Sequence, residues 1–452
     1  MRVLLVQAYL GRRDDIGPIF PLGLSYIATA LADHGHIVSL CDPNIAHDPG
    51  CAIAQAAAEA QPEVVGVSLR NIDTTDRQDW FYYYEHLDKT LDWIKRCASS
   101  AMLVIGGAGF SIFPTEIMHR NECLDFGVYQ EGEESIVELL EHLHNPTEVP
   151  GIYYRDGRTL RFTGFRTQVR FPDLPPPRRD FANLGYYREP LSVGVQTKRG
   201  CVLRCAYCTY PTLNGCQLRM RPATDVVNEI ESLSTDYGVT EVIFVDNVFD
   251  IPRSHAEDIS HEMIRRKLPV TWSAWFHPQG LNQDFIDLVR QAGCYRMCLS
   301  PDAVSQRSLN ALGKDLSEAD VKRCVALARN NPHIDFRFSV FCRPPGQSIR
   351  EILKTIWFII ETHVLIPNSK CLVSWIRVLP DTPIYKKAVD EGVMSSDVGD
   401  LLPQRGAAKE AIFYEPSSSP RWVTSLFLVL ICLCKRARWI CKAVGRLYRC
   451  GT

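Results

Sequence analysis

Residues 197–211 read TKRGCVLRCAYCTYP and place three cysteines, Cys201, Cys205 and Cys208, at the spacing C-x3-C-x2-C. Three thiolates on one tight loop can hold three corners of a cubane iron–sulfur cluster and leave its fourth iron for a small molecule. Gly200 permits the backbone torsions that a chain needs where it leaves a strand and wraps a cluster. Two other interpretations stay open, namely a zinc site completed by Cys216 and three ordinary buried thiols.

This stretch resembles the signature of the radical S-adenosylmethionine (SAM) superfamily, in which an aromatic residue usually stands at the position of Tyr207. The resemblance implies a [4Fe-4S] cluster on the three cysteines whose fourth iron binds SAM. The longer form, TKRGC followed by CxYCTYP, resembles the branch that also carries an N-terminal cobalamin-binding domain. The resemblance covers about residues 1–395.

Composition narrows the class of protein. The chain has 452 residues, enough for two or three domains, with 46% hydrophobic and 23% charged residues. A net charge of −2 argues against a nucleic-acid-binding protein. Seventeen cysteines without a secretory leader indicate a reducing compartment and metal or redox use, so we expect a cytoplasmic protein.

The first third of the chain alternates strand and helix patterns. Val3–Gln7 is a continuous apolar run, typical of a strand buried on both faces. Further strands are predicted at Ile37–Cys41, Val64–Leu69, Met102–Ile105 and Asp125–Tyr129, with helices between them. This alternation predicts a doubly wound parallel sheet, Rossmann-like, over residues 1–145, with its ligand beyond the carboxyl ends of the strands.

Three motifs in this third resemble the cobalamin-binding domain of the same branch: Phe20-Pro21-Leu22-Gly23-Leu24, Gly106-Gly107 and Glu131-Gly132-Glu133-Glu134. The resemblance implies that strand-end residues contact cobalamin, here Gly106, Gly107, Glu131 and Gly132. The D-x-H-x-x-G motif that often supplies a histidine to cobalt is absent from the sequence. We therefore expect cobalamin with no histidine below the cobalt.

Arg70 and Asn71 follow the third predicted strand, where a corrin face is expected. We predict that both line the lower face or amide rim of cobalamin. The alternative is that Arg70 pairs with Asp73 and closes a loop.

Residues 146–192 form a proline-rich connector with a small hairpin predicted around Asp156-Gly157. From 193 to 395 six strands are predicted, at 193–197, 241–246, 270–275, 296–300, 335–341 and 372–378, with helices between them. Six such units after a cluster loop predict a partial (β/α)6 radical SAM barrel, with active groups at the carboxyl ends of its strands.

That rule selects residues at the predicted strand ends: Asp246, Asn247, Trp275, Ser300, Asp302, Arg343 and Arg377. Each has a structural alternative, as a helix cap, a core residue or a surface ion pair. Phe244–Phe249 resembles the F-x-D-D-x-F stretch of the branch, and Pro344–Ser348 and Leu379–Pro383 resemble its G-x-P-G-E-T and P-G-T-P stretches. The SAM contacts we expect are Tyr207, Asp246, Asn247, Ser300, Asp302 and Arg377.

Residues 396–452 form a C-terminal segment. Within it, residues 421–452 hold seven Lys/Arg and no acidic residue, and the apolar run 422–434 is shorter than the roughly 18–20 residues of a bilayer span. This tail is predicted to pack on the protein or to touch a membrane surface, peripherally and without spanning it.

The resemblance implies a cobalamin-dependent radical SAM enzyme, most closely a class B type C-methyltransferase that uses SAM and methylcobalamin on an unactivated carbon or phosphorus. The resemblance also implies a small-molecule substrate and a flavodoxin- or ferredoxin-like electron donor. Trp272, Trp275, Phe276 and Trp375 are candidates for an aromatic substrate lining. Alternatives are ring formation, oxidation or rearrangement by the same cofactors, and polar methyl transfer without a deoxyadenosyl radical. The non-enzyme alternative is a zinc-stabilised binding module.

Overall fold

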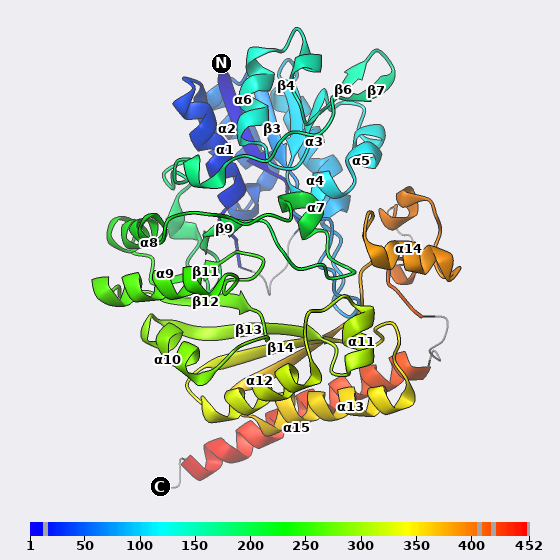
Figure 1. Ribbon diagram of the computed structural model, residues 1–452. Helices are drawn as coiled ribbons and strands as arrows, with labels where there is room; N and C mark the ends of the chain where they lie inside the picture. The colour runs from blue at the N-terminus through cyan, green and yellow to red at the C-terminus, as the bar shows by residue number, and fades with distance from the viewer. Residues whose placement is uncertain (12–16, 405–408, 417–421, 450–452) are drawn as a thin grey trace. The chain divides into compact units, whose positions relative to one another are not determined.

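The computed structural model describes residues 1–11, 17–404, 409–416 and 422–449 (Figure 1). The chain forms two compact units, each made of segments that are not continuous in sequence. The first contains Met1–Val202, Thr209–Ile243 and Val398–Ala408, and the second contains Leu203–Cys208, Phe244–Asp397 and Lys409–Thr452. The cluster-type loop is therefore divided, with Cys201 in the first unit and Cys205 and Cys208 in the second.

The first unit is built on a seven-stranded sheet in the order β2-β1-β3-β4-β5-β6-β7. Its five parallel strands are β1 (Arg2–Gln7), β2 (Ile37–Cys41), β3 (Val64–Ser68), β4 (Met102–Gly106) and β5 (Phe126–Val128). The helices between them include α1 (Leu22–Asp33), α2 (Pro49–Ala60), α3 (Leu87–Cys97) and α6 (Glu133–Glu141). The order 2-1-3-4-5 is that of a doubly wound sheet, as predicted, with its switch point between β1 and β3.

The predicted hairpin forms as β6 (Ile152–Asp156) and β7 (Thr159–Phe162). It does not stand apart in the connector, because β6 pairs antiparallel with β5 and extends the sheet. Ile152 is completely buried beside Val149 and Val128 in the core of this unit. Burial of that side chain gives the hairpin a reason to join the sheet.

The second large sheet, whose first strand precedes the cluster loop, has the order β15-β14-β13-β12-β11-β8. Its strands are β8 (Gly194–Val195), β11 (Glu241–Phe244), β12 (Thr271–Phe276), β13 (Cys294–Asp302), β14 (Asp335–Phe341) and β15 (Ser369–Ser374). Neighbours in the sheet are also neighbours among its strands in sequence, and β12 to β15 are parallel. This is the order expected of a partial (β/α) barrel.

The helices of the second unit are α9 (Arg253–Arg266), α10 (Gln283–Gln291), α11 (Gln306–Ala311), α12 (Glu318–Asn330), α13 (Ile349–Ile360), α14 (Pro383–Asp390) and α15 (Trp422–Arg449). Figure 1 shows α12 and α13 running alongside β13 and β14. Helix α12 begins at Glu318 because a capping box forms just before it. The Ser317 hydroxyl accepts from the Asp320 N–H at 3.2 Å, and the Asp320 carboxylate accepts from the Ser317 N–H at 2.9 Å.

Two strand boundaries differ from the prediction in ways that affect the site. β13 runs on to Asp302, so Ser300 and Asp302 end the strand rather than follow it. The pairing register shifts between Leu299 and Asp302, and Asp302 has φ +62°. An irregular strand end of this kind has no period-2 pattern that a sequence could reveal. β15 ends at Ser374, which leaves Arg377 beyond its carboxyl end.

Candidate functional site

The predicted cobalamin residues of the first unit all lie where its parallel strands end. Arg70 and Asn71 follow β3, Gly106 ends β4 and precedes Gly107, and Glu131 and Gly132 follow β5. Because the carboxyl ends of parallel strands share one edge, these residues lie along the ligand-binding edge of the sheet. Gly107 has φ +97°, and a Cβ there would lie 2.6 Å from the Leu69 carbonyl oxygen, so a side chain would separate the ends of β3 and β4.

Arg70 projects from this edge as an exposed side chain, and its guanidinium has no hydrogen bond or ion pair with other described residues. The Arg70–Asp73 pair that we considered as an alternative does not form between the described side chains; the Asp73 carboxylate accepts from the Thr75 N–H at 2.8 Å. A cation at a strand end without an internal partner remains available to a ligand.

Gly200 sets the conformation of the chain just before Cys201. Strand β9 (Lys198–Arg199) pairs antiparallel with β10 (Arg219–Met220), and the Cys201 N–H donates to the Gly215 carbonyl at 2.9 Å. Gly200 has φ +93°, and a Cβ there would lie 1.9 Å from the Gln217 carbonyl oxygen. The position therefore accepts only glycine without backbone movement.

We expect Gly200→Ala to destabilise the first unit by more than the roughly 1–3 kcal/mol of a non-glycine residue in a strained conformation, because a clash is added. The matched control is Gly238→Ala. Gly238 also has positive φ, +67°, but a Cβ there meets no atom within 4 Å. The difference between the urea-unfolding midpoints of the two variants measures the effect of the clash. Equal midpoints would contradict the close packing of Gly200.

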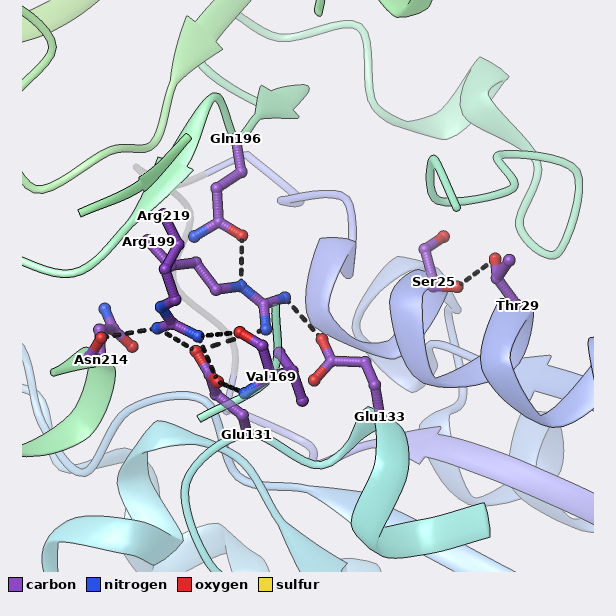
Figure 2. A network of polar contacts seen from close by, with 9 residues as sticks. All are labelled: Ser25, Thr29, Glu131, Glu133, Val169, Gln196, Arg199, Asn214 and Arg219. Carbon is purple, nitrogen blue, oxygen red and sulfur yellow. Dashed lines mark hydrogen bonds and ion pairs between the residues drawn. The ribbon is translucent and has the colours of Figure 1, made fainter. Parts of the chain in front are cut away.

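A buried ion-pair network holds β9 and β10 against the loop that follows β5 (Figure 2). Arg219 donates to both oxygens of Glu131, Nη1 to Oε2 at 2.7 Å and Nη2 to Oε1 at 2.6 Å. The same guanidinium donates to the carbonyls of Val169 at 2.6 Å and Asn214 at 2.8 Å. Glu131 Oε2 also accepts from the Val169 N–H at 3.0 Å. The Glu131 carboxylate, predicted to face cobalamin, is thus engaged by protein groups.

Arg199, two residues before Cys201, occupies the second half of this network. It donates to Glu133 Oε1 at 2.5 Å and to Gln196 Oε1 at 3.2 Å, and it lies over the Phe171 ring at 4.4 Å. Burial alone would raise the pKa of Glu133, but the Arg199 guanidinium outweighs burial and holds that pKa below its ordinary value. Both groups are therefore charged, and the strand that leads to Cys201 is fixed by them.

In the second unit, backbone bonds hold the part of the loop that carries Cys205 and Cys208. The Ala206 N–H donates to the Leu312 carbonyl at 2.8 Å, and the Ala206 carbonyl accepts from the Ile384 N–H at 2.8 Å. The Cys208 N–H donates to the Cys205 carbonyl at 3.1 Å, which closes a turn between the two thiols. Gly313, with φ +63°, packs where a Cβ would be 2.7 Å from the Arg204 carbonyl oxygen.

Three side chains meet beside this loop. The Tyr207 hydroxyl donates to Asp302 Oδ2, and Lys314 forms an ion pair with the same oxygen. Lys314 also donates to the Ser300 carbonyl at 2.9 Å, and the Ser300 hydroxyl bonds Ser339 Oγ at 2.8 Å. Burial and the Asp302 carboxylate raise the pKa of Tyr207 well above its ordinary value. Tyr207, Ser300 and Asp302, predicted separately, thus share one cluster at the end of β13.

The other predicted SAM residues lie elsewhere in the second unit. Asp246 is buried and Asn247 half-buried, just after β11. Arg377 is buried, and its Nη1 donates to the Val378 carbonyl at 2.6 Å.

Arg343, selected by its position after β14, has a structural role. It is buried and pairs with Glu415 at 3.1 Å, and it donates to Thr424 Oγ1 on α15 at 3.1 Å. The predicted aromatic lining is also corrected. Trp272 is fully buried between the rings of Phe244, Phe249 and Phe276, and its Nε1 donates to the Ala292 carbonyl at 2.7 Å. Trp375 is buried as well, so Trp275, 39% exposed, is left as the accessible tryptophan of that set.

Sequence reasoning missed Lys314, Arg199 and Arg219 as site residues. Lys314 ends the Leu309–Lys314 segment and follows Gly313, so its closeness to the cluster loop depends on tertiary packing. Arg199 and Arg219 lie 20 residues apart, and their pairing follows from the short β9–β10 ladder, which has no hydrophobic alternation.

Two findings bear on metal binding. Among the described residues, no three or more His, Cys, Asp or Glu side chains are gathered as a single metal-ion site. The three loop thiols are nevertheless soft donors of the kind that iron–sulfur clusters use. Cys201 is buried and Cys205 and Cys208 are half-buried, whereas Cys216, the candidate fourth zinc ligand, is exposed.

Residues 16–140 match the B12 binding domain family, and residues 195–359 match the radical SAM superfamily. The first match covers β2 to β5 of the parallel sheet and includes Arg70. The second match begins just before the cysteine loop and covers Tyr207, Asp302 and Lys314. The chain is therefore a cobalamin-binding radical SAM protein, and its relatives place it among the cobalamin-dependent radical SAM methyltransferase homologues.

Among curated proteins, the chain is 28% identical to cytidylyl-2-hydroxyethylphosphonate methyltransferase of Streptomyces wedmorensis, over 87% of this chain and 86% of that protein. It is 25% identical to tryptophan 2-C-methyltransferase of Streptomyces laurentii, over 83% of this chain and 73% of that protein. It is 26% identical to an uncharacterized methyltransferase of Pyrococcus horikoshii, over 66% of this chain and 64% of that protein.

Among solved structures, the radical SAM methyltransferase TsrM of Kitasatospora setae, with cobalamin and a [4Fe-4S] cluster bound, has a TM-score of 0.74 at 23% identity. That match covers 93% of this chain and 83% of TsrM. The cobalamin-dependent SAM radical enzyme OxsB has a TM-score of 0.71 at 16% identity, over 94% of this chain and 65% of OxsB. These likenesses show that the chain shares their fold.

Proposed function

We propose that this protein is a cobalamin-dependent radical SAM methyltransferase that methylates an unactivated carbon, or a phosphorus, of a small molecule. The proposal is carried by one combination in a single chain: a B12-type domain with an uncommitted arginine at its ligand edge, and a C-x3-C-x2-C loop within a radical SAM match. When bound, the cluster supplies one-electron reduction of SAM, and cobalamin supplies a methyl carrier.

Some residues of the chain would bind the cluster, and others would bind and orient SAM. Cys201, Cys205 and Cys208 would ligate the cluster, and Gly200 and Gly313 allow the loop to pack closely on its surroundings. Tyr207, Ser300 and Asp302, joined by Lys314, would present hydroxyl and carboxylate groups to SAM. Asp246 and Asn247, which follow β11, and Arg377, which lies beyond β15, remain proposed SAM contacts at other strand ends of the same sheet. Burial raises the pKa of the Cys205 thiol, and the nearby Lys314 ammonium opposes part of this rise.

For cobalamin we propose Arg70 and Asn71 as side-chain contacts, and Gly106, Gly107 and Gly132 as backbone surface. Glu131 would act through the loop that it holds, since both of its oxygens accept from Arg219. A flavodoxin- or ferredoxin-like electron donor and a membrane contact of residues 421–452 are further parts of this proposal; the second is argued below.

Replacing Arg70 by alanine is expected to weaken hydroxocobalamin binding about tenfold and to change its visible spectrum, because a charged hydrogen-bond donor is lost at the corrin. Titration followed by absorbance measures both. Lys95→Ala, an exposed residue at the end of α3, is the control and should leave both unchanged. Unchanged affinity and spectrum for Arg70→Ala would place that side chain away from cobalamin.

The activity is tested by anaerobic incubation of the reconstituted protein with SAM and a reductant. Formation of both 5′-deoxyadenosine and S-adenosylhomocysteine supports radical methylation. S-adenosylhomocysteine alone supports the second candidate, polar methyl transfer, which the unpaired Arg70 at the expected cobalt face favours. 5′-Deoxyadenosine alone would contradict methylation and support ring formation, oxidation or rearrangement as the reaction.

A further inference from the structure

Helix α15 is apolar on two faces, and its own protein covers one of them. Val423, Phe427 and Cys434 are at most 5% exposed and form the face that packs on the protein. Trp422, Leu426, Val429 and Leu433 are 37–58% exposed. Their spacing of four, three and four residues places them in one line along the helix. A helix that only packed on the protein would carry polar residues along that line.

Helix α13 contacts α15 and has the same property. Its buried face contains Ile352, Phe358 and Ile359. Ile349, Leu353 and Trp357, spaced by four residues, are 57–68% exposed. Figure 1 shows the two helices side by side. We call these two lines of exposed residues on α13 and α15 the apolar face. Large exposed apolar residues gathered on neighbouring elements mark interaction surfaces.

The charged residues of α15 indicate which kind of partner the apolar face binds. Residues 422–449 contain no Asp or Glu, and in sequence the stretch 435–449 of α15 holds six basic residues: Lys435, Arg436, Arg438, Lys442, Arg446 and Arg449. Arg436 is exposed. An apolar line with adjacent basic residues and no acidic residue matches an anionic lipid surface.

We propose that the apolar face docks on a membrane surface that contains anionic phospholipids, with α15 lying in the plane of the interface. Tryptophans such as Trp357 and Trp422 suit the boundary between headgroups and acyl chains. A second copy of the chain fits less well, because two such cationic helices would repel each other. The contact is peripheral: among the described residues, no helix is long and apolar enough to cross a membrane.

The test is flotation of the full-length protein with vesicles of phosphatidylcholine alone and of phosphatidylcholine with phosphatidylglycerol. We expect binding to the anionic vesicles and at least about tenfold weaker binding to the neutral ones, with a marked loss at about 0.5 M salt. The variant Arg436→Gln/Lys442→Gln/Arg446→Gln should weaken binding about hundredfold, at about fivefold per basic residue. Leu426→Ser/Val429→Ser/Leu433→Ser should remove binding at any salt concentration.

Matched controls test whether vesicle binding depends on the apolar face and α15 or on exposed charged and apolar residues anywhere on the protein. Lys89→Gln/Lys95→Gln/Arg96→Gln removes three exposed charges from α3, and Ile37→Ser/Phe165→Ser removes two side chains that are 70% and 76% exposed. Neither should alter binding. Absence of vesicle binding, or binding that both α15 variants retain, would overturn the proposal. Self-association in sedimentation velocity that the serine variant abolishes, without vesicle binding, would assign the face to a second copy.

Discussion

Cys205→Ala is expected to weaken the affinity of the loop for the cluster by more than about a hundredfold. The iron and sulfide content after anaerobic reconstitution should therefore fall, and 5′-deoxyadenosine formation should be abolished. Removal of groups that only orient metal ligands already costs about 10–100-fold, and this change removes a ligand. The thiol lies on a loop held by Leu312 and Ile384, so the protein fold should survive the substitution. Iron analysis and the broad absorbance of the cluster report the loss directly.

Cys216→Ala is the matched control for that prediction. Cys216 is exposed and lies just beyond the loop. In the cluster interpretation its removal leaves iron content unchanged. In the zinc interpretation it is the fourth ligand, so its removal would lower metal content as much as Cys205→Ala does. Iron loss in both variants, or zinc without iron in the parent protein, would contradict the account.

Arg219→Leu is expected to lower the free energy of unfolding of the first unit by about 3–5 kcal/mol, the cost of leaving a buried charge without its partner. Glu131, with 8% of its side chain exposed, would keep only the Arg199 contact at 3.6 Å and the Val169 N–H. The β9–β10 ladder beside Cys201 would lose support at the same time. Urea unfolding and the iron content after reconstitution should therefore both fall.

Arg170→Leu supplies the comparison. Arg170 pairs with Asp173 at 3.2 Å, but the two side chains are 85% and 58% exposed. Exposed pairs contribute little, so we expect a change below about 1 kcal/mol. The double variant Glu131→Leu/Arg219→Leu should recover part of the stability lost in Arg219→Leu, because no buried charge is then stranded by that substitution. Equal losses for Arg170→Leu and Arg219→Leu would show that the network does not hold the loop.

Much of the fold was predictable because apolar runs and turn signals repeat along the chain. Ile37–Cys41 forms the strand predicted at those bounds, and helices lie between the parallel strands as the pattern predicted. The pairing of β6 with β5 was not predictable, since a hairpin's sequence does not reveal which edge it joins. The extension of β13 to Asp302 was missed because a register shift disrupts its alternation.

For the site, spacing and residue type identified the cysteine loop, and the strand-end rule selected Ser300 and Asp302. Their joint contact with Lys314 could not be inferred, because it depends on how Gly313 packs against Arg204. Glu131 is instructive in another way. The motif marked it as a cobalamin residue, whereas its carboxylate binds two arginines near Cys201 in the folded unit. A motif identifies an important position without identifying the partner of its side chain.

The measurement that tests the account most directly is the cofactor content of the full-length protein after anaerobic reconstitution with iron, sulfide and hydroxocobalamin. We predict one corrin and four irons per chain, by absorbance and metal analysis, and an electron paramagnetic resonance signal of the reduced cluster that changes when SAM is added. A protein that takes up neither corrin nor iron, or a cluster signal indifferent to SAM, would contradict the account.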